Sequence, residues 1–172
     1  PHFGADPGAT RYAPLADLDR DNVAGLRVAW RWSARNFGPR PELRNVSMPV
    51  VQDGRVYLGA GATRSVVAVD AGTGETLWLW RPDEGARFEA AARKDSGKGV
   101  ALGTGADGRP RVFTATPGYF LVSLDASTGR PDPAFGDGGR VDLTEGLRRA
   151  PEQALDIGLT APPLVVGDVV VV

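Results

Sequence analysis

The sequence predicts an all-β fold made of repeated four-stranded units of the β-propeller kind, on the basis of three observations. The run at 66–78 is a complete hairpin signal: a β-branched strand, an Asp-Ala-Gly-Thr-Gly turn, and a second strand that reaches Trp. The pattern returns at 122–129, and the strands before it return as well. Twenty-three Gly and 14 Pro residues also fit many short strands and tight turns. A period of about 55 residues made of strands and turns is typical of a propeller-like repeat array.

The length of the chain limits how much of a propeller it can hold. At this period 172 residues contain about three repeats, whereas a closed propeller needs roughly four to eight blades. The last residues, 169–172, form an apolar strand with no turn or polar cap after them, which would be an aggregation hazard at a natural end. We therefore expect a lead segment at 1–26 and a partial propeller at 27–172, incomplete at its C-terminus, with blade-like units at about 46–82 and 98–135 and a third that opens at 161–172.

Charge and composition exclude several classes of protein. Lys and Arg total 20, Asp and Glu total 21, and they are interspersed, so neither a nucleic-acid-binding face nor a membrane patch is indicated. No apolar segment approaches the roughly 18 residues of a membrane span. Cysteine is absent, which excludes disulfides, thiolate metal sites and a cysteine nucleophile.

The first unit follows an irregular lead. Residues 1–14 contain too much Gly and Pro for a helix or a central strand, and 18–26 predicts about one helical turn, with Asp or Asn at its start and Gly at its end. The alternation Arg-Val-Ala-Trp-Arg-Trp at 27–32 predicts a half-buried strand. In a closed ring this strand would pair with the strands that arrive last.

Four strands and one long loop make up the first unit. Asp53-Gly54 lies between apolar runs and predicts a type I′ hairpin turn, because both residues tolerate left-handed conformations. The polar stretch at 83–99 is the longest interruption, and we expect a short helix at 84–94 within it. Long loops on a repeat array tend to lie on the binding face. The strands are expected at 46–51, 55–60, 66–69 and 76–80.

The second unit repeats this order with one defect. Asp107-Gly108 takes the place of the first hairpin turn, but Pro133 stands where the first unit has Trp78. The fourth strand is therefore degraded, and Phe135 is the residue expected to fill the gap. Gly167-Asp168 marks the turn of the third unit. The strands of the second unit are expected at 100–103, 110–115 and 119–124.

Four segments carry a resemblance to a known family. They are 4–15, 22–30, the repeat motif at 68–78, and the run Phe-Gly-Asp-Gly-Gly-Arg-Val-Asp-Leu-Thr-Glu-Gly-Leu at 135–147. In this order they resemble the N-terminal part of the quinoprotein dehydrogenases, the propeller enzymes that use pyrroloquinoline quinone (PQQ). The repeat motif is shared with quinone-free propellers, whereas the first and fourth segments are more particular to the enzymes, especially the glucose dehydrogenase branch.

The resemblance implies an eight-bladed propeller, of which this chain is the opening quarter to third, exported to the periplasm. It implies an oxidoreductase in which PQQ, held near the axis with Ca²⁺, accepts two electrons from a CH–OH group of a sugar or an alcohol. A quinone or a cytochrome would then accept the electrons. The calcium ligands and the catalytic base come from later blades, so none is assigned here, and the 172 residues alone are expected to be inactive. The chain starts at Pro1, so any export signal is expected to have been removed or left out.

The resemblance implies three cofactor-binding residues. Lys98 falls where the family has an Arg-Gly pair whose guanidinium approaches the quinone carboxylates; a Lys keeps the charge but not the planar, two-pronged geometry. Thr114 falls near a family Thr that bonds the cofactor, and Asn45 lies near a family Glu that is absent here. Each residue also has a structural interpretation: Lys98 as a solvated loop cation, Thr114 as a strand residue that alternates with Val112, and Asn45 as a turn former.

Other chemically suggestive residues are expected to be structural. The four Trp residues at strand spacing are expected to pack between sheets. Asp70 and Asp125 recur with the hairpin and are expected to hold its turn, and the single His2 lies in a terminus.

A second function hypothesis is a non-enzymatic propeller of the same repeat superfamily, a scaffold whose blades bind partner strands without a quinone. The segment at 135–147 and Arg11-Tyr12 favour the enzyme, whereas the missing Glu and Lys98 favour the scaffold or a divergent enzyme. The adjacent cysteines of the alcohol dehydrogenase branch are absent, which favours the sugar-type branch or another.

Overall fold

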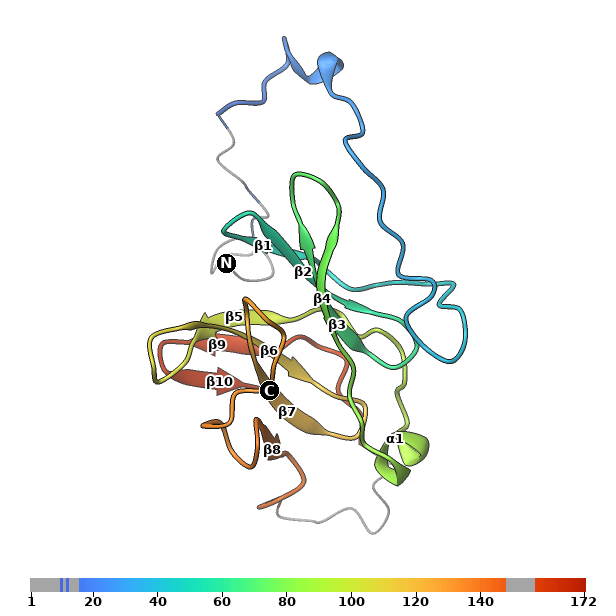
Figure 1. Ribbon diagram of the computed structural model, residues 1–172, viewed down its shortest axis with the longest axis vertical. Helices are drawn as coiled ribbons and strands as arrows, with labels where there is room; N and C mark the ends of the chain where they lie inside the picture. Colours follow the sequence, from blue (N-terminus) through green and yellow to red (C-terminus); the bar gives the residue numbers. More distant parts are fainter. Residues whose placement is uncertain (1–9, 11, 13–15, 148–156) are drawn as a thin grey trace.

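The computed structural model describes residues 10, 12, 16–147 and 157–172, and within them it contains two four-stranded antiparallel sheets and a separate hairpin (Figure 1). The predicted all-β architecture of four-stranded units is confirmed. The first sheet contains β1 (Val50–Gln52), β2 (Arg55–Ala60), β3 (Ser65–Asp70) and β4 (Thr76–Trp80). The second contains β5 (Ala101–Thr104), β6 (Pro110–Ala115), β7 (Phe120–Asp125) and β8 (Arg140–Asp142). The hairpin is β9 (Leu164–Val166) and β10 (Val169–Val171), and two short helices are η1 (Val23–Gly25) and α1 (Ala86–Ala90).

The tight turns between the strands have the predicted geometry. Asp53 and Gly54 both have positive φ, at 50° and 71°, and join β1 to β2 as a two-residue loop of the type I′ kind. Gly167, with φ of 62°, begins the two-residue turn between β9 and β10. The helical turn predicted at 18–26 is η1, and the helix predicted at 84–94 is the shorter α1. His2 lies outside the described residues.

Asp70 and Asp125 close the turns that follow β3 and β7, as predicted. The Oδ1 atom of Asp70 accepts hydrogen bonds from the Thr73 backbone N–H and hydroxyl, at 2.8 and 3.1 Å. The Oδ1 atom of Asp125 accepts hydrogen bonds from the Ser127 backbone N–H and from the Thr128 backbone N–H. Hydrogen bonds from the Thr73 backbone and from the Ser127 hydroxyl are the largest causes that lower the pKa of these two carboxyls. Both carboxylates serve their turns.

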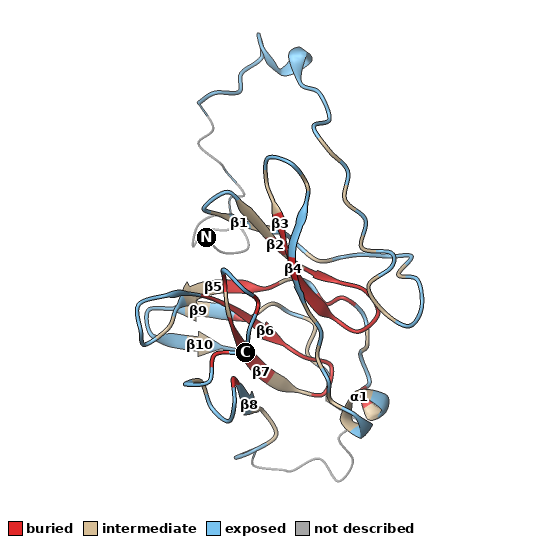
Figure 2. Ribbon diagram, in the orientation of Figure 1, coloured by how far each residue is buried: buried red, intermediate tan, exposed pale blue. Residues whose placement is uncertain are grey.

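The first sheet packs against the second through one shared apolar core. Side chains of β2, β3 and β4, among them Tyr57 and Trp78, contact Val112 of β6 and Leu124 of β7. Figure 2 shows the buried residues gathering on β3, β6 and β7, at the centre of the two sheets. Two amphipathic sheets that bury their inner faces in this way behave as neighbouring blades.

Trp78 docks the first unit on the second. Its indole Nε1 donates a hydrogen bond to the Ala126 carbonyl at 3.1 Å, and its ring lies over Gly129, where a Cβ atom would come within 2.4 Å of it. The Tyr57 ring lies 6.0 Å from the indole, and the Tyr57 hydroxyl donates to the same carbonyl. Only a residue without a side chain fits beneath the indole, so Gly129 is required by packing as well as by its positive φ.

Trp30 docks the lead on the first unit in the same way. Its Nε1 donates to the Ala71 carbonyl at 3.0 Å and its ring covers Gly74. The strand predicted at 27–32 is not formed within the described residues, since this segment makes no ladder hydrogen bonds there. A strand needs a partner, and the described part of the chain supplies none beside it. Trp30 and Trp32 therefore pack on one face of the first sheet, rather than between two sheets as predicted for the Trp residues.

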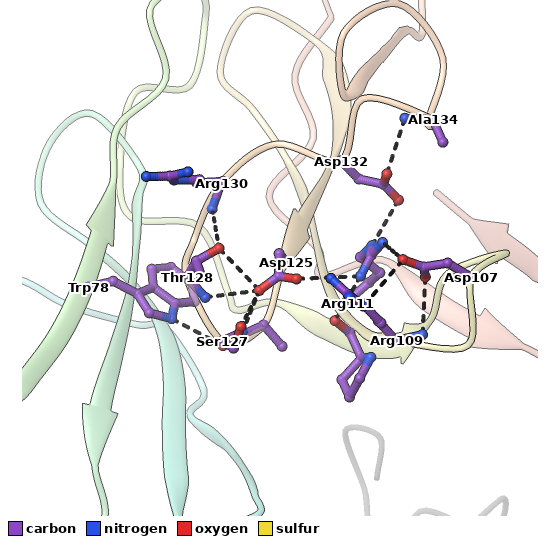
Figure 3. Close-up of polar contacts among 12 residues, drawn as sticks. Trp78, Asp107, Arg109, Arg111, Asp125, Ser127, Thr128, Arg130, Asp132 and Ala134 are labelled. Carbon is purple, nitrogen blue, oxygen red and sulfur yellow. Dashed lines mark hydrogen bonds and ion pairs between the residues drawn. The ribbon is translucent and has the colours of Figure 1, made fainter.

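The second unit, which has Pro133 where the first has Trp78, contains a buried ionic cluster around Arg111 (Figure 3). The Arg111 guanidinium, 5% exposed, donates from Nε to Asp132 and from Nη2 to Asp107, both at 2.8 Å, and lies 3.7 Å from Asp125. The fourth strand comes only at 140–142, where β8 pairs with β7. Phe135 packs edge to face on Phe113 at 5.7 Å, beside this cluster.

Candidate functional site

The two ends of each sheet carry different connections. The Asp-containing turns lie at one end of the sheets. The opposite end, which we call the loop end, is where β1, β5 and β9 begin; the connection at 81–99 and residues 157–160, which lead into β9, lie there. None of the helices within the described ranges is long and apolar enough to cross a membrane.

Three chain segments meet side by side at the loop end. The backbone N–H of Met48 donates to the Lys98 carbonyl at 2.8 Å, and the backbone N–H of Lys98 donates to the Thr160 carbonyl at 2.8 Å. A parallel bridge between Met48 and Gly99 continues the contact. These bonds place Lys98 between the residues that lead into β1 and β9.

A groove of about 640 Å³ runs along these three segments, between residues 48–51, 98–102 and 161–165. Its walls are largely apolar, with Val50, Val100 and Leu102 among them, and Lys98 stands at the loop end. The volume falls within the roughly 300–1,000 Å³ of typical small-molecule sites. The Lys98 side chain is exposed, and no carboxylate among the described residues lies within 4 Å of its amine.

Asn45 lies beside the groove rather than in its wall. Its side-chain Nδ2 donates to the Gly59 carbonyl at 3.2 Å and to Glu42 at 3.3 Å, and its Oδ1 accepts the Ser47 backbone N–H at 2.8 Å. Both ends of the amide are used to shape the loop before β1. These contacts match the turn-forming interpretation, and a contact between Asn45 and a cofactor stays a prediction.

Thr114 lies inside the second sheet. It is 2% exposed, pairs with Val122 in the ladder, and is not among the residues that line the groove. Thr116, the residue directly after β6, lies at the loop end. Its hydroxyl donates to the Glu84 carboxylate and accepts the Phe120 backbone N–H at 3.0 Å. A role for Thr114 at a cofactor stays a prediction, whereas Thr116 is a loop-end residue that the pattern did not single out.

Three further residues of the loop end were not predicted. Glu42 accepts the Gly61 backbone N–H at 2.9 Å, Thr160 accepts the Lys98 backbone N–H through its carbonyl, and Arg64 is a buried cation in the turn after β2. Nothing in their sequence neighbourhood marks them, because their partners lie far along the chain. The two-residue spacing of Thr114, within β6, and Thr116, directly after it, is the signal that could have found Thr116.

An ion pair holds α1 against the second sheet. Arg87 donates from both terminal nitrogens to the Asp142 carboxylate, one of them at 3.1 Å, and its guanidinium lies 3.9 Å from the Phe120 ring. The side chains are 28% and 23% exposed. The Arg87 hydrogen bond is the largest cause that lowers the pKa of Asp142. The pair therefore fixes the long connection at 81–99 to β8.

We expect acid to weaken this attachment. Because the folded-state pKa of Asp142 lies below its unfolded value, the stabilisation is complete above about pH 4 and is lost as the pH falls through the carboxyl range. Asp142→Asn should lower the free energy of unfolding by about 1–2 kcal/mol at pH 7 and by less at pH 3. Urea unfolding at both pH values measures this, and an equal loss at the two pH values would contradict it.

The chain matches the family model described as glucose/ethanol/alcohol dehydrogenase, beta-propeller domain, over residues 1–172. It is 30% identical over 180 residues to the glycerol dehydrogenase large subunit of Gluconobacter oxydans, covering 99% of this chain and 23% of that one. It is 29% identical over 189 residues to the quinate/shikimate dehydrogenase (quinone) of Acinetobacter baylyi, with coverage of 99% and 23%. The crystal structure of the quinohemoprotein alcohol dehydrogenase from Comamonas testosteroni matches with a TM-score of 0.70 and 26% identity, over 98% of this chain and 22% of that one. The chain thus spans about a quarter of the length of the curated relatives it matches.

Proposed function

Because this chain belongs to the family of glucose, ethanol and alcohol dehydrogenase β-propeller domains, we propose that it forms part of a PQQ-dependent dehydrogenase that oxidises a CH–OH group of a sugar or an alcohol. One observation in the structure supports this beyond the family match. The groove at the loop end combines apolar walls with Lys98, a cation without a carboxylate partner among the described residues. An unpaired cation beside an apolar slot suits a flat, anionic ligand.

The residues of the groove fit PQQ, a planar aromatic quinone with carboxylates. When bound, PQQ supplies a two-electron acceptor for the substrate. The aliphatic side chains of Val50, Val100 and Leu102 would hold the flat rings and exclude water. The Lys98 amine would pair with a carboxylate of the ligand as a charge-assisted hydrogen bond. A Lys makes this contact as a point charge, so it orients the ligand less strictly than an Arg would.

The remaining parts of the reaction are proposed to come from outside the described residues. Ca²⁺ takes six to eight oxygen ligands, and the described ranges contain no group of three carboxylate or histidine side chains that could hold a metal ion. We assign the calcium ligands and the catalytic base to the rest of the full-length protein. The 172 residues alone are therefore expected to show no dehydrogenase activity.

The location, the electron acceptor and the substrate are also proposals. We propose that the protein acts in the periplasm and passes electrons to a quinone or a cytochrome. The relatives are named for glycerol, quinate or shikimate, and alcohol. These compounds share a secondary or primary carbinol, and we propose a substrate of this class.

Titration of the full-length protein with PQQ in the presence of Ca²⁺ tests the proposal, together with dye reduction on alcohols and sugars. Lys98→Ala should weaken PQQ binding by about tenfold to a hundredfold, because the ligand's carboxylate loses its charged partner. Lys94→Ala is the matched control: Lys94 pairs with Glu89 at 3.4 Å in the same connection but does not line the groove. Full-length protein that binds no PQQ would favour the scaffold hypothesis. Unchanged PQQ binding in Lys98→Ala would indicate that Lys98 is a solvated loop cation with no role in the groove.

A further inference from the structure

Arg64 uses all of its hydrogen-bonding capacity on the loops of the loop end. Its side chain is 4% exposed and lies in the turn between β2 and β3. Nε donates to the Asp95 carbonyl at 3.1 Å, Nη1 donates to the carbonyls of Ala115 and Leu159 at 3.2 and 2.5 Å, and Nη2 donates to the Arg93 carbonyl and the Asp95 carboxylate at 3.3 and 3.4 Å. A guanidinium has five N–H donors, and here each has an acceptor. Arg64 therefore has no donor left for a ligand.

The acceptors belong to three different parts of the fold. Residues 93–95 belong to the connection that leads to Lys98, Ala115 ends β6 of the second unit, and Leu159 leads into the third unit. Arg64 itself belongs to the first unit. One side chain thus ties all three units together at the end where the groove lies.

The contacts of the buried guanidinium indicate that Arg64 positions loops rather than forming a strong ion pair. Burial is the largest cause acting on the pKa of Arg64, and burial lowers that pKa. Among the described residues, the carboxylate that Arg64 contacts is that of Asp95, at 3.4 Å, and this side chain is 50% exposed. Four backbone carbonyls provide most of the compensation for the buried charge. Carbonyls of a main chain have fixed directions, so the guanidinium sets where those loops run.

Two of the tethered segments lead directly to the Lys98 contacts. The Leu159 carbonyl bonds Arg64, and the next carbonyl, that of Thr160, accepts the Lys98 N–H at 2.8 Å. On the other side, Asp95 bonds Arg64 three residues before Lys98. Gly97 lies between Asp95 and Lys98, and its backbone is so close to Arg64 that a Cβ atom at Gly97 would lie 3.1 Å from the Arg64 Nε. The Lys98 backbone is therefore held from both sides by segments that Arg64 fixes.

We propose that Arg64 is a positioning residue for the cofactor groove: it holds the segments 93–97 and 159–160 side by side and thereby places Lys98. This inference rests on the proposed function, since it names what orients the Lys98 contact with the quinone. Arg64 does not touch the ligand. Its loss should affect how tightly the quinone binds more than the turnover of enzyme that has bound it.

Arg111 provides a matched control for a buried arginine. It is 5% exposed and lies at the opposite end of β6 from Ala115. It bonds side-chain carboxylates and the carbonyl of Pro110 in its own strand, rather than the carbonyls of loops. Arg→Lys at either position keeps the charge but removes the five-donor fork. Both variants should lower the stability of the fold. Only the change at Arg64 should act on the groove.

The experiment measures PQQ affinity and turnover in the full-length protein with Ca²⁺ for wild type, Arg64→Lys and Arg111→Lys. Arg64→Lys should weaken PQQ binding at least about tenfold, with turnover at saturating PQQ within about twofold of wild type. Arg111→Lys should lower the unfolding midpoint while its PQQ affinity stays within about twofold of wild type. Equal PQQ affinities in the two variants would overturn the inference, since Arg64 would then be structural only.

Gly97→Ala keeps the test decisive if Arg64→Lys does not fold. Its Cβ atom crowds the guanidinium while leaving all five donors in place, and the Gly97 φ of 67° adds strain. PQQ binding should weaken about three- to tenfold. Wild-type affinity in Gly97→Ala would overturn the inference. Failure of the wild-type protein itself to bind PQQ is a separate result, and it would count against the proposed function.

Discussion

Trp78→Ala is expected to lower the free energy of unfolding of the full-length protein by about 3–5 kcal/mol. The indole is 9% exposed and sits in the core that joins the first sheet to the second. Its removal leaves a cavity above Gly129 and deprives the Ala126 carbonyl of one of two side-chain donors. Because the residue lies between units, the loss should reduce the cooperativity between them as well as the stability of either.

Denaturant unfolding followed by tryptophan fluorescence and circular dichroism measures this effect. Trp78→Phe keeps one aromatic ring in the core and loses the N–H donor and part of the indole volume, so it should cost about 1–2 kcal/mol. Leu77→Ala is the matched control, since Leu77 is the neighbouring residue of β4 and is 43% exposed; it should change stability by about 1 kcal/mol or less. If Trp78→Ala costs no more than Leu77→Ala, the indole does not carry the contact between the units.

The strands and turns could be predicted because their signals are local. Asp53-Gly54 forms its turn from its own backbone preferences, and the Asp70 carboxylate bonds residues two and three positions further on. The strand at 27–32 was predicted from alternation alone, but pairing depends on a partner strand that the described residues do not supply. β8 was not expected at 140–142, because its position depends on how the chain folds after Pro133.

For the candidate site, the sequence predicted individual residues but not the contacts that bring them together. The structure places Lys98 in the wall of a groove, whereas Asn45 and Thr114 do not line it. Arg64 could not be predicted from the sequence. Four of its acceptors are main-chain carbonyls up to 95 positions away, and a main-chain carbonyl occurs at every residue, so no sequence pattern marks it. Contacts between a side chain and distant main-chain carbonyls can be identified only from the three-dimensional structure.

The second prediction with a large effect concerns the ionic cluster of the second unit. Asp132→Ala is expected to cost about 3–5 kcal/mol, because it leaves the Arg111 guanidinium buried without its nearest carboxylate at Nε. Hydrogen bonding to Asp132 is the largest cause that raises the pKa of Arg111, so the cation cannot escape the penalty by losing its proton near neutral pH.

Two comparisons separate the charge from the packing. Asp132→Asn keeps an acceptor oxygen for Nε and the bond to the Ala134 N–H, so it should cost about 1–2 kcal/mol, well below the Ala variant. Arg109→Ala is the surface control: Arg109 lies 3.9 Å from Asp107 with its side chain 73% exposed, and its loss should cost about 0.5 kcal/mol or less. Denaturant unfolding at neutral pH gives all three values. If Asp132→Ala and Arg109→Ala prove equally mild, the ionic cluster does not stabilise the second unit, and apolar packing such as that of Phe135 on Phe113 stabilises it instead.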